Sequence, residues 1–145
     1  MSKWARIENE DEYKISEESA QKAVREVLDF YEIDTTRDDK EQEKVLDGYL
    51  DSFMKAYRRG NFENKQDEDH GFCVVQHLKN GDKLTYRELR GKDRIVMEGF
   101  DNTRPYSRAY AILGKLSGHG EDVIKKLKGK DWKDAEALAM VFFMV

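Results

Sequence analysis

Apolar residues in the first 60 positions recur at steps of three and four, the spacing of a helix that buries one face. One stripe follows Ser16, a suitable N-cap, and ends at Tyr31. A second stripe ends at Tyr57, shortly before Gly60, which is a natural residue to follow a helix. These patterns predict a helical hairpin. Its stripes are Ala20, Ala23, Val24, Val27, Leu28 and Tyr31, then Val45, Leu46, Tyr49, Leu50, Phe53, Met54 and Tyr57.

Residues 61–70 are polar and are interpreted as a linker, after which the period of the pattern changes. Residues 72–78 and 83–89 favour strands, and Asn80-Gly81 between them is a strong hairpin signal. A two-residue turn there pairs Leu78 with Lys83, His77 with Leu84 and Val75 with Tyr86. One face of the hairpin then carries Cys73, Val75, His77, Leu84 and Tyr86, and the other carries Phe72, Val74, Leu78, Thr85, Arg87 and Leu89.

Short helical stripes complete the chain, over residues 92–100, 107–116, 123–127 and 130–143. The predicted fold class is α+β and mostly α-helical: an N-terminal helical hairpin, one β-hairpin and a C-terminal cluster of short helices. Two parts are expected. Residues 1–65 form an acidic helical hairpin with a flexible arm, and residues 66–145 form the β-hairpin with the helical cluster.

Charge and composition exclude several classes of function. The formal net charge is −4, with 12 Lys/Arg against 17 Asp/Glu in residues 1–65 and 14 against 13 in residues 66–145. Neither part has the basic excess that duplex DNA binding requires. No apolar run approaches the ~18 residues of a membrane span, and the start of the chain has no apolar signal core. The lone cysteine, Cys73, cannot form an internal disulfide, so we expect a cytoplasmic protein that does not act at a membrane.

Candidate chemistry is sparse. His70 follows the run Asp67–Asp69 and could join a divalent metal site, but a solvated acidic loop is the favoured interpretation. Cys73 and His77 lie four positions apart on one strand, too far for a nucleophile and its base, so a core thiol and a hydrogen-bonded histidine are expected. The glycines of Gly118–Gly120 fit a turn better than a phosphate loop. The sequence predicts no enzyme, no catalytic residues, no metal and no cofactor.

A basic cluster around the end of the second strand supports an alternative function. Arg87, Arg90, Lys92 and Arg94 lie close to Tyr86 and could bind RNA or phosphate, although Glu88 and Asp93 dilute the charge. We therefore do not expect nucleic acid to be the main partner. The alternative is a small nucleic-acid-binding or regulatory accessory protein using residues 87–94.

The C-terminal half is rich in apolar residues and ends in an almost wholly apolar run, residues 141–145. These residues either fill the core or form a patch that docks on another chain. Under the second interpretation the candidate partner-binding residues are Tyr86, Ile112, Leu116, Trp132, Leu138, Phe142 and Phe143.

Residues 72–143 contain a series of motifs in a characteristic order: Leu84–Leu89, Arg90–Arg94, Ala109–Gly118, Glu121–Leu127, Lys130–Trp132 and the apolar Val141–Phe143. This order resembles the phage tail assembly chaperones of Mu-like and related long-tailed phages. Each motif is a packing or capping signal, so the resemblance rests on their order. The family usually starts near the hairpin, whereas here residues 16–60 come first.

This resemblance implies a non-catalytic phage or prophage protein of the host cytoplasm that is not part of the mature virion. Such chaperones coat the tail tape measure protein while the tail tube assembles around it. The implied partner is therefore the tape measure protein, with the tail tube protein as a second candidate and self-association as a further expectation. Short apolar helices suit this role because they accept a client helix in a groove.

Overall fold

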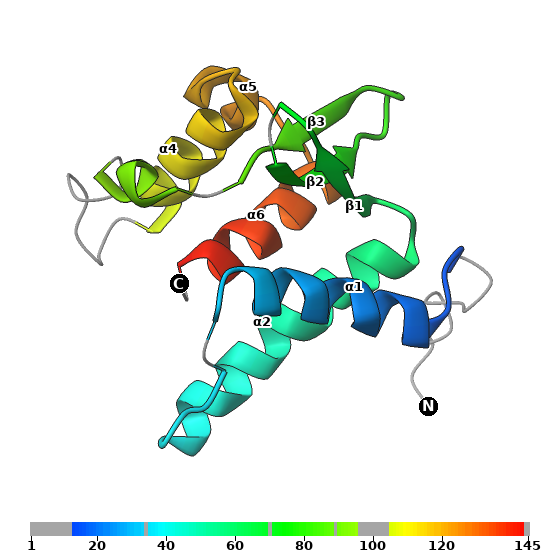
Figure 1. Ribbon diagram of the computed structural model, residues 1–145, viewed down its shortest axis with the longest axis vertical. Coiled ribbons are helices and arrows are strands. Elements are labelled where there is room, and N and C mark those ends of the chain that lie inside the picture. Colours follow the sequence, from blue (N-terminus) through cyan, green and yellow to red (C-terminus); the bar gives the residue numbers. More distant parts are fainter. Residues whose placement is uncertain (1–12, 34, 70, 89, 96–104, 144–145) are drawn as a thin grey trace.

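The computed structural model describes residues 13–143 apart from 34, 70, 89 and 96–104, and it confirms the predicted mostly helical α+β fold (Figure 1). A helical hairpin comes first, then a three-stranded antiparallel sheet, then short helices. The elements are α1 (Glu17–Phe30), α2 (Lys40–Arg58), β1 (Phe62–Asp67), β2 (Gly71–His77), β3 (Lys83–Tyr86), the 3₁₀ helix η3 (Gly91–Arg94), α4 (Pro105–Ser117), α5 (Glu121–Lys125) and α6 (Lys130–Phe142).

The α1–α2 hairpin forms as the sequence predicts. The Ser16 hydroxyl caps α1 by accepting a hydrogen bond from the Ser19 amide at 3.1 Å. The Asp39 carboxylate caps α2 in the same way, and Gly60 follows α2 with a φ of +78°. Residues 1–12 of the predicted flexible arm lie outside the described residues, but the amides of Lys14 and Ile15 both donate to the Arg58 carbonyl. The last residues of the arm are therefore held against the end of α2.

The prediction of a linker over residues 61–70 is wrong in part, because residues 62–67 form the strand β1. This strand pairs with β2 over six residue pairs, from Phe62 opposite Gln76 to Asp67 opposite Gly71. The sequence signal is weak because β1 has one large apolar residue, Phe62, and is otherwise Glu, Asn, Lys, Gln and Asp, of which Asn and Asp are depleted in strands. Pairing with a buried central strand overrides that local preference.

The hairpin register differs from the prediction by one residue. His77 lies opposite Lys83 and Val74 opposite Tyr86, so residues 79–81 form a three-residue loop. The Gly81 amide donates to the Leu78 carbonyl, and Gly81 has a φ of +93°, as expected for a tight turn that ends in a left-handed residue. The slip exchanges the two faces of β3 relative to β2. The face that packs on the helices carries Phe72, Val74, Gln76, Leu84 and Tyr86, all at most 5% exposed.

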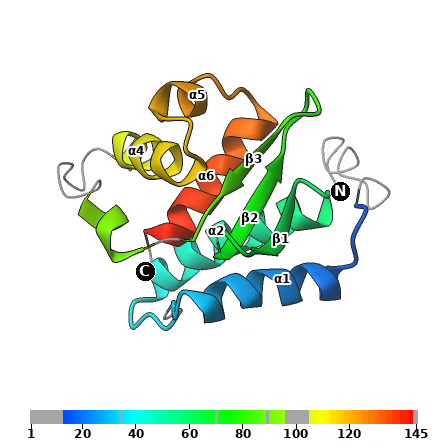
Figure 2. The same cartoon turned by 45° about the horizontal axis from the view of Figure 1, so that its top comes forward.

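Helix α6 occupies the centre of the fold, between the α1–α2 pair and the α4–α5 pair (Figures 1 and 2). Aromatic rings join the layers: Phe30 of α1 stacks on Phe72 of β2 at 4.6 Å, and Tyr31 meets Phe142 of α6 at 5.6 Å. One hydrophobic cluster contains residues from both predicted parts of the chain. The boundary predicted at residue 65 falls inside β1, and the division into two parts stays a prediction.

The C-terminal helices match three of the four predicted stripes, and a Gly-containing turn separates α4 from α5 as expected. The exception is the helix expected over residues 92–100. Its start is the 3₁₀ helix η3, Ile95 is exposed, and Val96 and Phe100 lie outside the described residues. Pro105 is the first residue of α4, where its missing amide hydrogen costs nothing.

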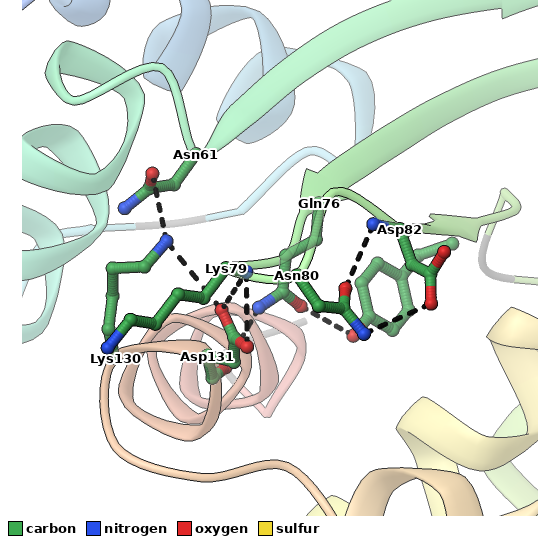
Figure 3. A network of polar contacts seen from close by, with 8 residues as sticks. Asn61, Gln76, Lys79, Asn80, Asp82, Lys130 and Asp131 are labelled. Carbon is green, nitrogen blue, oxygen red and sulfur yellow. Dashed lines mark hydrogen bonds and ion pairs between the residues drawn. The ribbon is translucent and has the colours of Figure 1, made fainter.

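A polar network fixes the start of α6 to the hairpin loop (Figure 3). The Asp131 carboxylate accepts a hydrogen bond from the Lys79 amide at 3.1 Å, and the Gln76 side chain donates to the Asp131 carbonyl at 2.8 Å. The Tyr86 hydroxyl donates to the amide oxygen of the same Gln76 side chain. Lys130 bridges Asp131 and the Asn61 side chain. These contacts hold α6 in a fixed position against the sheet.

Candidate functional site

Five of the seven predicted partner-binding residues belong to the core. Their burial leaves them unable to touch another chain unless the core opens, so the core-filling interpretation applies to them. They are Tyr86, Ile112, Leu116, Leu138 and Phe142, each at most 2% exposed.

Trp132 and Phe143 are half-buried and remain candidate contacts. Trp132 lies 5.2 Å from the Tyr110 ring, measured between ring centroids, and the exposed Tyr106 ring lies beyond it at 6.2 Å. Phe143 follows α6 directly and lines a groove between α6 and α2.

This α2–α6 groove has an apolar half with a volume of about 560 Å³. Val45 and Tyr49 of α2 are 57% and 37% exposed there, although the sequence pattern placed both on the buried stripe. The core-facing positions of α2 are Leu46, Phe53, Ala56 and Tyr57, so Val45 and Tyr49 form one edge of the stripe. The residues lining the apolar half are Arg37, Asp39, Glu41, Gln42, Val45, Leu46, Tyr49, Met140 and Phe143.

A polar half of about 410 Å³ continues from the apolar half, and Tyr49 lines both. Most of the lining positions recur at steps of three and four, from Gln42 to Arg59 along α2 and from Lys133 to Phe143 along α6. Such spacing places them on one flank of each helix. The residues lining the polar half are Tyr49, Ser52, Lys55, Arg59, Lys133, Asp134, Glu136 and Ala137.

Asp134 is the unusual residue of the polar half. It is 7% exposed, and its Oδ2 has no hydrogen-bond partner among the described residues. Burial raises the pKa of this carboxyl to about 6, against the opposing effects of Lys130, of the Asn61 amide and of Arg59. The Asn61 side-chain amide lies near the Asp134 carboxylate and lowers its pKa, but its nitrogen also lacks a well-formed hydrogen bond. It therefore counteracts only part of the rise in pKa that burial causes.

The raised pKa makes stability depend on pH in a defined direction. Because Asp134 has a pKa of about 6 in the folded protein and an ordinary value of 3.8, the folded state holds more protons between these values. The free energy of unfolding therefore falls as pH rises from about 4 to 6. Replacing Asp134 with asparagine should raise it by about 1–2 kcal/mol at pH 7 and flatten that slope. Urea unfolding at pH 4.5 and pH 7.5 measures both effects; an unchanged slope in Asp134→Asn contradicts the assignment.

The basic cluster proposed for nucleic acid is partly used inside the fold. Arg87 forms a bidentate ion pair with Asp93, with Nη2–Oδ1 at 2.8 Å and Nη1–Oδ2 at 2.9 Å. The Asp93 carboxylate is fully buried and also accepts the Arg90 amide. The hydrogen bond from Arg87 holds the pKa of Asp93 below its usual value. Arg90 and Lys92 are exposed, whereas the side chain of Arg94 lies outside what the structure describes, so Arg87 is the member of the predicted cluster that the fold uses internally.

The other candidate chemistry has structural roles. Cys73 is 1% exposed, which confirms a core thiol, and His77 pairs with Glu63 at 3.0 Å, which confirms a hydrogen-bonded histidine. His70 lies outside the described residues. Within residues that the structure describes, no three His, Cys, Asp or Glu side chains gather into a group that could hold a metal ion.

No family model, curated protein sequence or solved structure matches this chain. Among the helices that the structure describes, none combines the length and apolarity needed to cross a bilayer.

Proposed function

We propose that the protein is a non-catalytic tail assembly chaperone of a phage or prophage. It acts in the host cytoplasm, is absent from the finished virion, and binds a segment of the tail tape measure protein in the α2–α6 groove. The observation that carries this proposal is the groove itself, where Val45 and Tyr49 are exposed beside half-buried Met140 and Phe143. The ordered resemblance of residues 72–143 supplies the kind of client.

The chemistry of the groove supports a protein client. Its apolar half presents aliphatic, aromatic and thioether side chains, which suit the apolar face of a helix. Charged residues such as Asp39 and Glu41 line its rim, in keeping with a polar border around an apolar centre. The acidic α1–α2 hairpin keeps a complex with an apolar client soluble.

Co-expression with the tape measure protein encoded in the same phage genome tests the proposal. The tape measure protein should co-purify with the chain, and Val45→Glu should reduce the yield of the complex at least tenfold. Val45 is exposed on a helix and glutamate is a good helix former, so the variant should fold normally. Circular dichroism and thermal unfolding check that it does.

Ile95→Glu is the matched control, because Ile95 is also an exposed aliphatic residue, at 66%, and lies outside the groove. It should retain the complex. If no tape measure protein co-purifies, or if both variants lose it equally, the proposal is wrong.

A further inference from the structure

The strand β1 forms an open edge of the sheet. The His77 amide of β2 donates to the Asn61 carbonyl, so these two residues form a hydrogen-bonded pair of the antiparallel ladder. Bonded and unbonded pairs alternate along such a ladder, which makes the backbone N–H and C=O groups of Asn64 and Gln66 point away from β2. No residue that the structure describes bonds these groups, and Gln66 is exposed. The edge at Asn64 and Gln66 can therefore pair with a further strand.

A groove runs along this edge, between β1 and α1, and is named the α1–β1 groove. Its volume is about 560 Å³, and Figure 2 shows α1 passing beneath β1. Asn64, Lys65 and Gln66 all line it. Because neighbouring residues of a strand point to opposite faces, three consecutive lining residues show that the edge of β1, and not one face alone, borders the groove.

The α1 side of the groove combines an aromatic surface with negative charge. Phe30 is 42% exposed and stacks on the buried Phe72 ring at 4.6 Å between centroids. Glu26 and Asp29 are exposed on the same flank of α1, three positions apart. No lysine or arginine in the described part of the chain pairs with the Asp29 carboxylate. A ligand that fits here has an aromatic or large apolar side chain close to a positive charge.

We propose that the α1–β1 groove binds an extended segment of another protein, which adds a strand antiparallel to β1, lays an aromatic side chain against Phe30 and places a lysine or arginine beside Glu26 and Asp29. The partner residues opposite Asn64 and Gln66 each exchange two backbone hydrogen bonds with β1. Their side chains point to the α1 face of the sheet, as that of Asn64 does, since its amide donates to the Ala23 carbonyl at 3.0 Å.

The order of the two partner residues follows from β1. Gln66 lies opposite Phe72 in the sheet, near the Phe30 ring, so the aromatic residue belongs opposite Gln66. The Asn64 side chain donates to Glu26 at 3.0 Å, so the basic residue belongs opposite Asn64. In an antiparallel strand the aromatic residue then comes two positions before the basic one. The residue between them points to the opposite face.

A second copy of this chain fits the edge poorly. Pairing two copies of β1 about Asn64 would place Gln66 opposite Phe62, which is 1% exposed and has its backbone inside the fold. Pairing about Lys65 would place two lysines opposite each other, and like charges in that position are unfavourable. The occupant is therefore a segment of a different protein. Binding here is independent of the proposed function, because no residue lines both this groove and the α2–α6 groove.

Synthetic peptides test this mode of binding. The probe is a fluorescein-labelled peptide of sequence Gly-Ser-Thr-Phe-Thr-Arg-Thr-Ser, measured by fluorescence anisotropy with the full chain. Alanine in place of its phenylalanine, glutamate in place of its arginine, and N-methylation of the phenylalanine and arginine amides should each weaken binding at least tenfold. N-methylation of the threonine between them is the matched control. That amide points away from β1, so its methylation should change binding less than twofold.

Variants of the protein locate the peptide. Gln66→Pro removes an amide hydrogen that points to the open edge, where proline is tolerated, and should weaken binding at least tenfold. Asp29→Lys should weaken it at least fivefold, whereas Asp47→Lys, the same change on an exposed residue of α2 outside the groove, should have no effect. Val45→Glu should also leave peptide binding unchanged, although it should remove the tape measure protein.

Four results would overturn strand addition at β1. They are no binding of the unmodified peptide at up to about 1 mM protein, equal binding of the two kinds of N-methylated peptide, equal effects of Asp29→Lys and Asp47→Lys, and loss of peptide binding in Val45→Glu. The N-methylated peptides decide the question even if Gln66→Pro does not fold, because they are measured on the unmodified chain. None of these results bears on co-purification of the tape measure protein.

Discussion

Replacing Asp93 with asparagine should lower the free energy of unfolding by about 3 kcal/mol at pH 7. The Asp93 carboxylate is fully buried, and it accepts two hydrogen bonds from Arg87 and one from the Arg90 amide. Removing one member of such a pair leaves the other charge without compensation, which typically costs about 3–5 kcal/mol. The partial exposure of Arg87, at 21%, places the expected loss at the lower end. Urea unfolding of both proteins measures it.

The same pair sets the response to acid. Because the pKa of Asp93 is lowered in the folded protein, the pair contributes its full stability above the ordinary carboxyl pKa of 3.8, and that contribution is lost as pH falls below it. Asp93→Asn should lack this acid-dependent loss.

Asp51→Asn is the control for the ion pair. Asp51 pairs with Lys55 on the exposed face of α2, where such pairs contribute less than about 1 kcal/mol. Equal costs for Asp93→Asn and Asp51→Asn would contradict the structural role of the buried pair.

Replacing Gly114 with alanine should lower the free energy of unfolding by about 3 kcal/mol and the melting temperature by about 10 °C. Gly114 lies where α4 crosses the start of α5, and its carbonyl accepts the Gly120 amide. An added Cβ would lie 2.6 Å from the Gly120 carbonyl carbon and 2.7 Å from the Glu121 nitrogen. Both are backbone atoms, so no rotamer change relieves the clash, and the two helices must separate.

For Gly48→Ala we expect the opposite effect, a rise in the free energy of unfolding. Gly48 lies inside α2 with nothing within 4 Å of the added Cβ, so alanine should stabilise the helix by about 0.5–1 kcal/mol. Thermal unfolding compares the two substitutions directly. A Gly114→Ala protein as stable as Gly48→Ala would show that α4 and α5 do not approach as closely as described.

Local sequence signals predict most of the fold but not its long-range details. The caps, the helical stripes and the hairpin arise from neighbouring residues, so their locations follow from the sequence. The hairpin register does not, because Asp131 accepts the Lys79 amide from 52 positions away and helps to hold the three-residue loop. That register places Leu84 and Tyr86 on the same face as Gln76 rather than His77, and Gln76 bonds Tyr86 and Asp131 there.

The candidate site was less accessible to sequence reasoning than the fold. Val45 and Tyr49 belong to the apolar stripe of α2, but they lie at its edge and are exposed. The position of α6 against α2 determines which residues of the stripe are buried, and the local sequence does not show that position. Burial of Asp134 has no sequence signal, since it is one of five charged residues in the first half of α6 and charged residues normally face solvent. The sequence shows the apolar excess of the C-terminal half, but most of these residues fill the core.

Hydrogen–deuterium exchange of the full chain, alone and in complex with the tape measure protein, is the most direct measurement of where the client binds. We expect slower amide exchange at residues 42–52 of α2 and 133–142 of α6 in the complex. Slower exchange confined to the backbone amides of Arg90–Lys92 or to those around Tyr106 and Trp132, with α2 unchanged, would contradict client binding in the α2–α6 groove.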